Sequence, residues 1–179
     1  SVSNGSGDII DNNDTDADDS ASLVVSAVRI GGVEGSGNAG TVGQALTGTY
    51  GQLTLNANGS YSYVANQDAA DDLDASDQVT DVFNYTLSDG TATDTATITI
   101  TVTGINDAPV ADNETGAVNE DATLTVTDGT SDVLHGDTDA DDSASLTVSA
   151  IRTGAEDGSG TSGSIGSGLT GTYGTLTLA

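Results

Sequence analysis

Apolar and polar residues alternate along several short stretches of the chain, which is the pattern of half-buried β-strands. In residues 93–103, four apolar side chains fall on one face and six threonines on the other. In residues 23–28, Leu23, Val25 and Ala27 alternate with Val24, Ser26 and Val28, and we expect the second set to face outward. Similar alternation marks 51–55, 61–63 and 83–87. No stretch keeps a helical period over three turns, so the pattern predicts an all-β, antiparallel sandwich.

Turn residues separate these stretches. Residues 88–91 (SDGT) predict a tight hairpin turn, because Gly and, more weakly, Asp accept positive φ. A G-x-G-x-x-G pattern occurs at Gly35 and again at Gly158, but no helix-forming run follows that could hold a phosphate. We therefore interpret both as hairpin loops. Only the Asp-rich residues 68–78 are compatible with a helical turn.

The chain contains a long internal repeat. Residues 14–55 align without a gap on residues 137–178, with 29 of 42 positions identical, so the period is 123 residues. A unit of this size suits a whole β-sandwich rather than a solenoid repeat. We place the boundary before Ala108-Pro109. Residues 1–107 would then be a first sandwich repeat lacking its N-terminal edge, and 108–179 the N-terminal half of a second, cut from a longer protein.

The composition of the chain argues against several classes of function. The 179 residues include 24 Asp and 4 Glu against two Arg and no Lys, giving a net charge of -26. This charge repels nucleic acid and anionic membranes, and no stretch is apolar enough for membrane insertion. The chain has no Cys and one histidine, His135, which we expect to be a solvated loop residue. With neither a nucleophile-and-base set nor a lysine, we expect no enzyme.

Calcium binding explains these carboxylates better than catalysis does. Asp recurs at alternate positions in loops, and a hard cation takes six to eight oxygen ligands. The Gly and Glu of an EF-hand are missing, so further ligands must come from elsewhere in the fold. The alternative is a solvated loop that serves solubility. The candidate calcium ligands are Asp14, Asp16, Asp18, Asn106, Asp107, Glu120, Asp121, Asp137, Asp139 and Asp141.

Six stretches together resemble the VCBS repeat family of cadherin-like, Ig-like β-sandwich units. They are GQLTLNANGSYSY (51–63), TDVFNYTLSDG (80–90), TDTATITITVTGINDAPVA (93–111), VNEDATLTV (118–126) and the two DTDADD loops at 14 and 137. The resemblance implies an extracellular, calcium-bound, non-catalytic repeat in tandem in large bacterial surface and type I-secreted proteins. It also implies that Asn106-Asp107, Glu120-Asp121 and the Asp137 loop meet at the junction. DTDADD lacks the glycine common after the third Asp of such loops.

The main hypothesis is a structural spacer of a long adhesin or surface fibre, whose partners are neighbouring repeats of the same chain. A second is a self-assembling filament subunit that exchanges strands with other copies of itself in a fibre. A third is a carbohydrate-binding module using Tyr61, Tyr63 or Tyr85, which we rank lower because the alternation points these rings inward.

Overall fold

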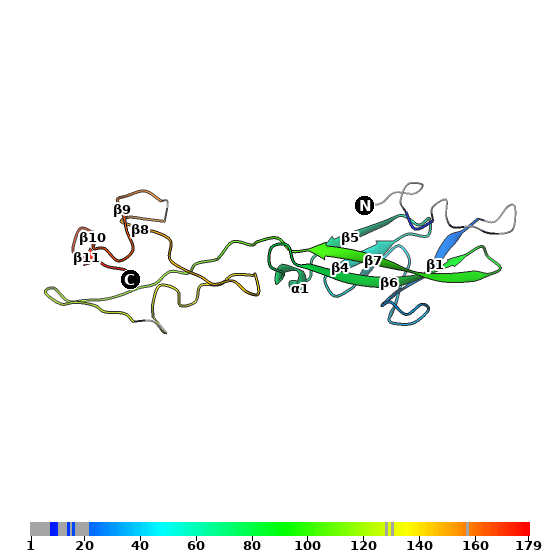
Figure 1. Cartoon of the computed structure of the whole chain (residues 1–179), viewed down its shortest axis with the longest axis horizontal. Helices are drawn as coiled ribbons and strands as arrows, with labels where there is room; N and C mark the ends of the chain where they lie inside the picture. Colours follow the sequence, from blue (N-terminus) through cyan, green and yellow to red (C-terminus); the bar gives the residue numbers. More distant parts are fainter. Residues whose placement is uncertain are drawn as a thin grey trace. The chain divides into compact units, whose positions relative to one another are not determined.

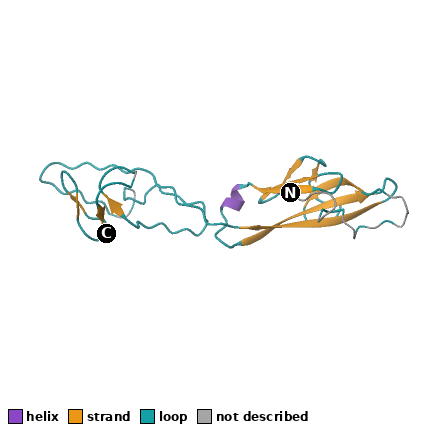
Figure 2. Ribbon diagram, turned by 90° about the horizontal axis from the view of Figure 1, so that it is seen from above, coloured by secondary structure: helices purple, strands orange, loops and turns teal. Residues whose placement is uncertain are grey.

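The computed structural model describes residues 8–10, 14, 16, 22–127, 129, 131–156 and 158–179. The chain divides into two compact units, Ser1–Asp107 and Ala108–Ala179. Figure 1 colours the first unit from blue to green and the second from green to red. The long strands all lie in the first unit, whereas most of the second is drawn as loop (Figure 2). Among the described residues, no helix is long and apolar enough to cross a membrane.

The first unit contains two antiparallel sheets. One has the order β2-β1-β6-β7 and the other the order β3-β4-β5. The strands of the first sheet are β1 (Val24–Ile30), β2 (Ala39–Gly40), β6 (Gln78–Ser88) and β7 (Thr93–Thr103). Those of the second are β3 (Ala45–Thr47), β4 (Gly51–Leu55) and β5 (Tyr61–Ala65). The short helix α1 (Asp68–Asp71) connects the two sheets, within the segment predicted to form a helical turn.

Side chains from both sheets meet in one core. Phe83 of β6 and Leu53 of β4 are completely buried, and the T-shaped contact of Phe83 with Tyr63 joins the sheets. The buried cluster consists of Val25, Val28, Leu46, Leu53, Leu55, Phe83, Tyr85 and Ile98. Two antiparallel sheets around a shared core form a β-sandwich, which confirms the predicted fold class.

The alternation predicted for β1 is only partly correct. Val25 faces the core and Val24 is 41% exposed, as expected, but Val28 is 2% exposed and also lies in the core. The cause is a bulge between Val25 and Ala27, where β1 carries one residue more than its partner β6. The extra residue reverses the alternation, so Val28 faces inward and its predicted outward position is wrong.

Strands β6 and β7 pair along their whole lengths, from Gln78 with Thr103 to Ser88 with Thr93. In β7 the apolar positions face inward and the threonines outward, as predicted. The connection is a hairpin, but it has a four-residue loop rather than a two-residue turn. The Asp89 carboxylate holds this loop, accepting bonds from the backbone N–H groups of Thr91 (2.7 Å) and Ala92 (2.6 Å).

The glycine-rich segment after β1 is a hairpin loop, as predicted, and no helix follows it. Asn84 of β6, which is 1% exposed, anchors this loop. Its side chain donates hydrogen bonds to the carbonyls of Gly31 (2.9 Å) and Ser36 (3.0 Å), and it accepts one from the N–H of Gly35 (3.1 Å). The β1–β2 connection is therefore tied to the centre of the sheet.

The second unit contains short strands in the same local arrangement. They are β8 (Ile151–Arg152), β9 (Ser162–Gly163), β10 (Leu169–Thr170) and β11 (Thr175–Leu176). Ile151 pairs with Gly163, and Val28, 123 positions earlier, pairs with Gly40. Likewise Leu169 pairs with Leu176 where Leu46 pairs with Leu53. The repeated sequence thus forms the same two hairpins in both units.

Candidate metal centre

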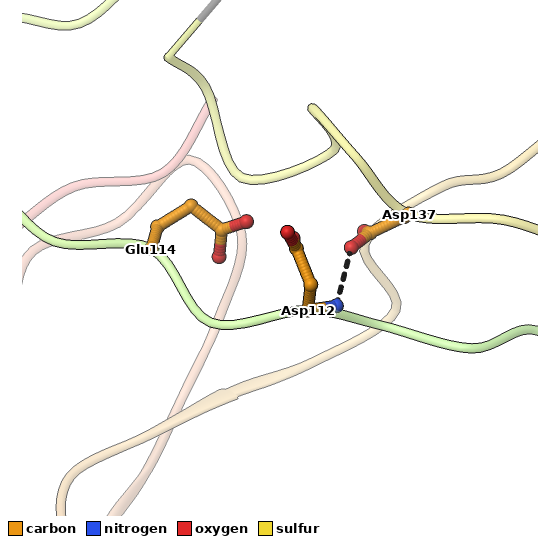
Figure 3. A group of neighbouring side chains, drawn as sticks. All are labelled: Asp112, Glu114 and Asp137. Carbon is orange, nitrogen blue, oxygen red and sulfur yellow. Dashed lines mark hydrogen bonds between the residues drawn. The ribbon is translucent and has the colours of Figure 1, made fainter.

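Three carboxylates converge in the second unit, those of Asp112, Glu114 and Asp137 (Figure 3). Asp112 and Glu114 are two residues apart on one segment, and Figure 3 shows both side chains on the side that faces Asp137. A β-bridge between Val110 and Thr138 brings the two segments together, with N···O distances of 2.7 and 2.9 Å. One residue before Thr138, the Asp137 carboxylate accepts a bond from the N–H of Asp112 (3.0 Å).

The geometry of this cluster suits calcium. One oxygen from each carboxylate lies within 4.8 Å of the others. Calcium binds oxygen at about 2.3–2.6 Å, so two ligands of one ion are at most roughly 5 Å apart. All three donors are hard oxygens, and Asp112 and Glu114 are exposed, which leaves room for water to complete the coordination.

The electrostatics of the cluster favour a cation. The side-chain hydrogen bond with Asp112 raises the pKa of Glu114 above its ordinary value, with smaller contributions from desolvation and from the charges of Asp112 and Asp137. A raised pKa means that the third negative charge is added against repulsion. A bound divalent cation would remove that repulsion and return all three groups to the ionised form.

Of these three ligands, sequence reasoning included Asp137 and missed Asp112 and Glu114. The available signal was the D-x-E spacing of residues 112–114, three residues after Pro109 at an expected strand start. That spacing alone is weak, because acidic pairs are common in this chain. What identifies the pair is the bridge to Thr138, a contact between segments that are distant in sequence.

The other predicted ligands of the second unit lie in turns. Asp139 accepts a hydrogen bond from the N–H of Asp141 (3.0 Å). Glu120 is exposed, and Asp121 adopts a left-handed φ of 64° beside it. Within the part of the chain that the structure describes, no second group of three acidic or histidine side chains comes within 4.8 Å. The role of these four predicted ligands in calcium binding remains a prediction.

In the first unit, Asp14 and Asp16 line a cavity of about 340 Å³ together with Asp89 and Asp94 of the β6–β7 hairpin. Hydrogen bonds from the backbone of Ala92 and Thr91 and from the Thr91 hydroxyl lower the pKa of Asp89 to about 2. Its carboxylate is therefore ionised throughout the physiological range. Asp18, the third predicted ligand of this loop, lies outside the described residues.

Asn106 and Asp107 are at the end of the first unit. The side-chain amide of Asn106 donates to the backbone carbonyl of Asp107. Both are the last residues before the boundary at Ala108. Their predicted participation in a calcium site is untested.

Residues 1–104 match the family model of the bacterial cadherin-like domain, which covers more than half of the chain. The chain belongs to the bacterial cadherin-like domain family. Searches of curated proteins and of solved structures found no significant match. The matched residues comprise both sheets of the sandwich, so the family assignment and the observed fold agree.

Three tyrosines of the cadherin-like unit, Tyr61, Tyr63 and Tyr85, belong to or pack against the core. Tyr85 is buried, and Tyr61 and Tyr63 pack against the core cluster. The Tyr63 hydroxyl donates to Asp81 of the opposite sheet. These rings contribute to the packing of the sandwich. His135 is exposed in its loop, as predicted.

Proposed function

We propose that this chain is a calcium-stabilised, non-catalytic structural repeat of a long extracellular adhesin or surface fibre. In that role it spaces a binding tip away from the cell, in the manner of VCBS repeats. The family and the sandwich fold support a structural, adhesin-type repeat. The observation that carries the calcium part of the proposal is the convergence of Asp112, Glu114 and Asp137.

The DTDADD loop occurs in both units, and each unit shows a different acidic neighbour of this loop. Asp137 and Asp14 occupy the same position of the repeat, the first residue of DTDADD. Asp137 meets the carboxylates of the preceding segment, whereas Asp14 lies beside the β6–β7 hairpin. A repeat that contains both the preceding acidic segment and the β6–β7 hairpin would have carboxylates on two sides of this loop.

Calcium would stabilise the folded state through charge. With a net charge of -26, repulsion opposes compaction, and a cation that binds only the folded form shifts the equilibrium toward it. A free calcium concentration about 100 times the Kd adds about 2.7 kcal/mol. Clamped loops would also stiffen a tandem array, which is what a spacer requires.

The test is thermal unfolding of the 179-residue chain in calcium and in chelator, followed by circular dichroism, with calorimetric titration for binding. We expect calcium to raise the Tm by several degrees, and Asp137→Asn to reduce both the shift and the affinity. Asp71→Asn in α1 is the matched control, because it removes one charge outside the cluster. Equal Tm values in calcium and chelator would refute the calcium role.

The location and spacer role need a separate measurement. Antibody against the chain should label intact source cells without permeabilisation, and small-angle scattering of a multi-repeat protein should give a longer maximum dimension in calcium than in chelator. Labelling only after permeabilisation, or equal dimensions in both conditions, would contradict this part of the proposal.

A second candidate function is a filament subunit that exchanges strands between copies. Exposed apolar side chains of the second unit favour it, among them Leu176 and Tyr173. Sedimentation over a range of protein concentrations tests it, since a filament subunit must self-associate. A monomer at all concentrations would exclude it.

A further inference from the structure

Gly136 directly precedes Asp137 and lies against the carboxylate of Asp112. A Cβ added at Gly136 would lie 2.7 Å from Oδ2 of Asp112 and 3.1 Å from its Cγ. Both distances are well inside the optimal separation of about 3.5–4.0 Å between non-bonded carbon atoms. The Asp112 carboxylate therefore occupies space that a side chain at position 136 would fill.

Two contacts fix Asp112 against the segment that contains Asp137. The backbone N–H of Asp112 donates to Oδ1 of Asp137 (3.0 Å), and the Val110–Thr138 bridge holds the two segments in register. The Asp112 carboxylate lies between those of Glu114 and Asp137 (Figure 3), and one oxygen of each lies within 4.8 Å of the others. A displacement of the Asp112 carboxylate would therefore separate the three oxygens.

The loop before Gly136 is held by Asp132. The Asp132 side chain accepts a hydrogen bond from the N–H of Leu134 (2.9 Å), and its carbonyl accepts one from the N–H of His135 (3.2 Å). The chain then turns at Gly136, whose φ is +93° and lies in the region that glycine adopts most easily. Gly136 thus connects this ordered loop to Asp137.

The need for a positive φ does not by itself account for the close approach at Gly136. At Gly158 and Gly166, which also have positive φ, an added Cβ would meet no atom within 4 Å. Among the positive-φ glycines in the described part of the chain, Gly136 is the one whose Cβ would collide with a carboxylate. This glycine therefore meets two requirements, the turn of the backbone and the position of Asp112.

We infer that Gly136 is a positioning residue of the proposed metal centre, because its missing side chain allows the Asp112 carboxylate to share one cation with Glu114 and Asp137. The inference rests on the proposed calcium function and adds a requirement for the residue before the DTDADD motif. Relief of the contact with a methyl group at position 136 would move the Asp112 carboxylate by about 1 Å. Calcium binds oxygen at about 2.3–2.6 Å, so such a shift would remove this ligand from the ion.

The test is a calcium titration of the ¹⁵N-labelled 179-residue chain and of its Gly136→Ala variant, followed at the amide resonances of Asp112 and Thr138. These resonances report on this site separately from any other calcium site of the chain. The methyl group of the variant supplies no ligand and should displace the Asp112 carboxylate. We expect the Kd measured at both resonances to rise about tenfold or more.

Gly166→Ala is the matched control. Gly166 lies in the same unit with a φ of +79°, and a Cβ there would meet no atom within 4 Å. Both substitutions place alanine at a positive φ, so both should lower the Tm measured in chelator. Only Gly136→Ala should also weaken calcium binding. Equal Kd values for the wild type and Gly136→Ala, or equal weakening in the two variants, would overturn the inference.

A second measurement covers the case in which Gly136→Ala does not fold. Nuclear Overhauser spectra of the wild-type chain, recorded in calcium and in chelator, should show a contact between the α-protons of Gly136 and the β-protons of Asp112. Absence of this contact under both conditions would overturn the inference. A wild-type chain that binds no calcium would refute the proposed function and this inference with it, whereas unchanged binding by Gly136→Ala would overturn the inference alone.

Discussion

The Tyr63 hydroxyl donates a 2.6 Å hydrogen bond to Oδ2 of Asp81 and thereby connects the two sheets of the sandwich. Burial alone would raise the pKa of Asp81, but the bonds from Tyr63 and from three backbone N–H groups outweigh it and lower the pKa below 3.8. Desolvation, followed by the bond to the carboxylate, raises the pKa of Tyr63. A buried charge is thus fully hydrogen-bonded at the centre of the first unit.

Asp81→Asn should destabilise the chain by about 2–4 kcal/mol, because the amide retains one acceptor and turns an N–H group toward backbone donors. Tyr63→Phe removes one of the four bonds and should cost only about 1–2 kcal/mol. Urea unfolding followed by circular dichroism measures both. If Asp81→Asn unfolds at the wild-type urea concentration, the carboxylate is not needed for stability.

The same carboxylate predicts a dependence of stability on pH. Since folding lowers the pKa of Asp81 below 3.8, its contribution is present above about pH 4 and is lost as the pH falls through the folded-state value. The difference in unfolding free energy between wild type and Asp81→Asn should therefore shrink below pH 4. A difference that stays constant from pH 6 to pH 2.5 would contradict this assignment.

Glu114 should titrate in the opposite sense. Folding raises its pKa above 4.5, so its ionisation opposes the folded state as the pH rises through that raised value. Calcium should lower the pKa of Glu114, which ¹³C carboxyl shifts recorded during pH titration can measure. In Asp137→Asn the effect of calcium should largely disappear. A pKa of Glu114 that calcium leaves unchanged would remove it from the metal site.

Asn84→Ala should release the loop between β1 and β2. The variant leaves the carbonyls of Gly31 and Ser36 without their donor, and we expect a loss of about 1–3 kcal/mol together with faster amide exchange in residues 31–38. Asn66→Ala is the control, since Asn66 is exposed and should change stability by no more than about 0.5 kcal/mol. Equal effects at both positions would argue against an anchoring role.

The bulge in β1 predicts different effects of one substitution at two valines. Val28→Thr places a hydroxyl in the core and should cost about 1–3 kcal/mol. Val24→Thr lies on the exposed side, where the second unit has Thr147, and should change stability by less than about 0.5 kcal/mol. Equal costs would mean that β1 runs without the bulge.

The strands that the sequence pattern predicts well are those with regular pairing. In β7 no bulge intervenes, so Ile98 and Val102 face inward and the threonines outward, as the period of two requires. In β1 the period fails at Val28, because a bulge is a relationship between two strands and the sequence of β1 alone does not contain it.

The candidate site shows the same limit. Asp137 is recognisable from the repeated DTDADD motif. Asp112 and Glu114 become neighbours of Asp137 only through a contact between segments that are 25 residues apart. The sequence pattern does not identify the roles of Asp81 and Asn84 either, because in the sequence they are only polar residues within an apolar strand. Their partners are backbone groups of other loops, and local pattern carries no information on these.

Strands β1 and β7 lie on opposite sides of β6 and are both antiparallel to it, so they run in the same direction. Within this sheet β1 is the first strand in the chain and β7 the last. A pull on the two ends therefore slides the outer strands along β6 instead of peeling them away. Because ladder bonds lie perpendicular to the strands, this load falls on many of them at once. Mechanical resistance of the first unit accordingly depends on the Gln78–Ser88 strand.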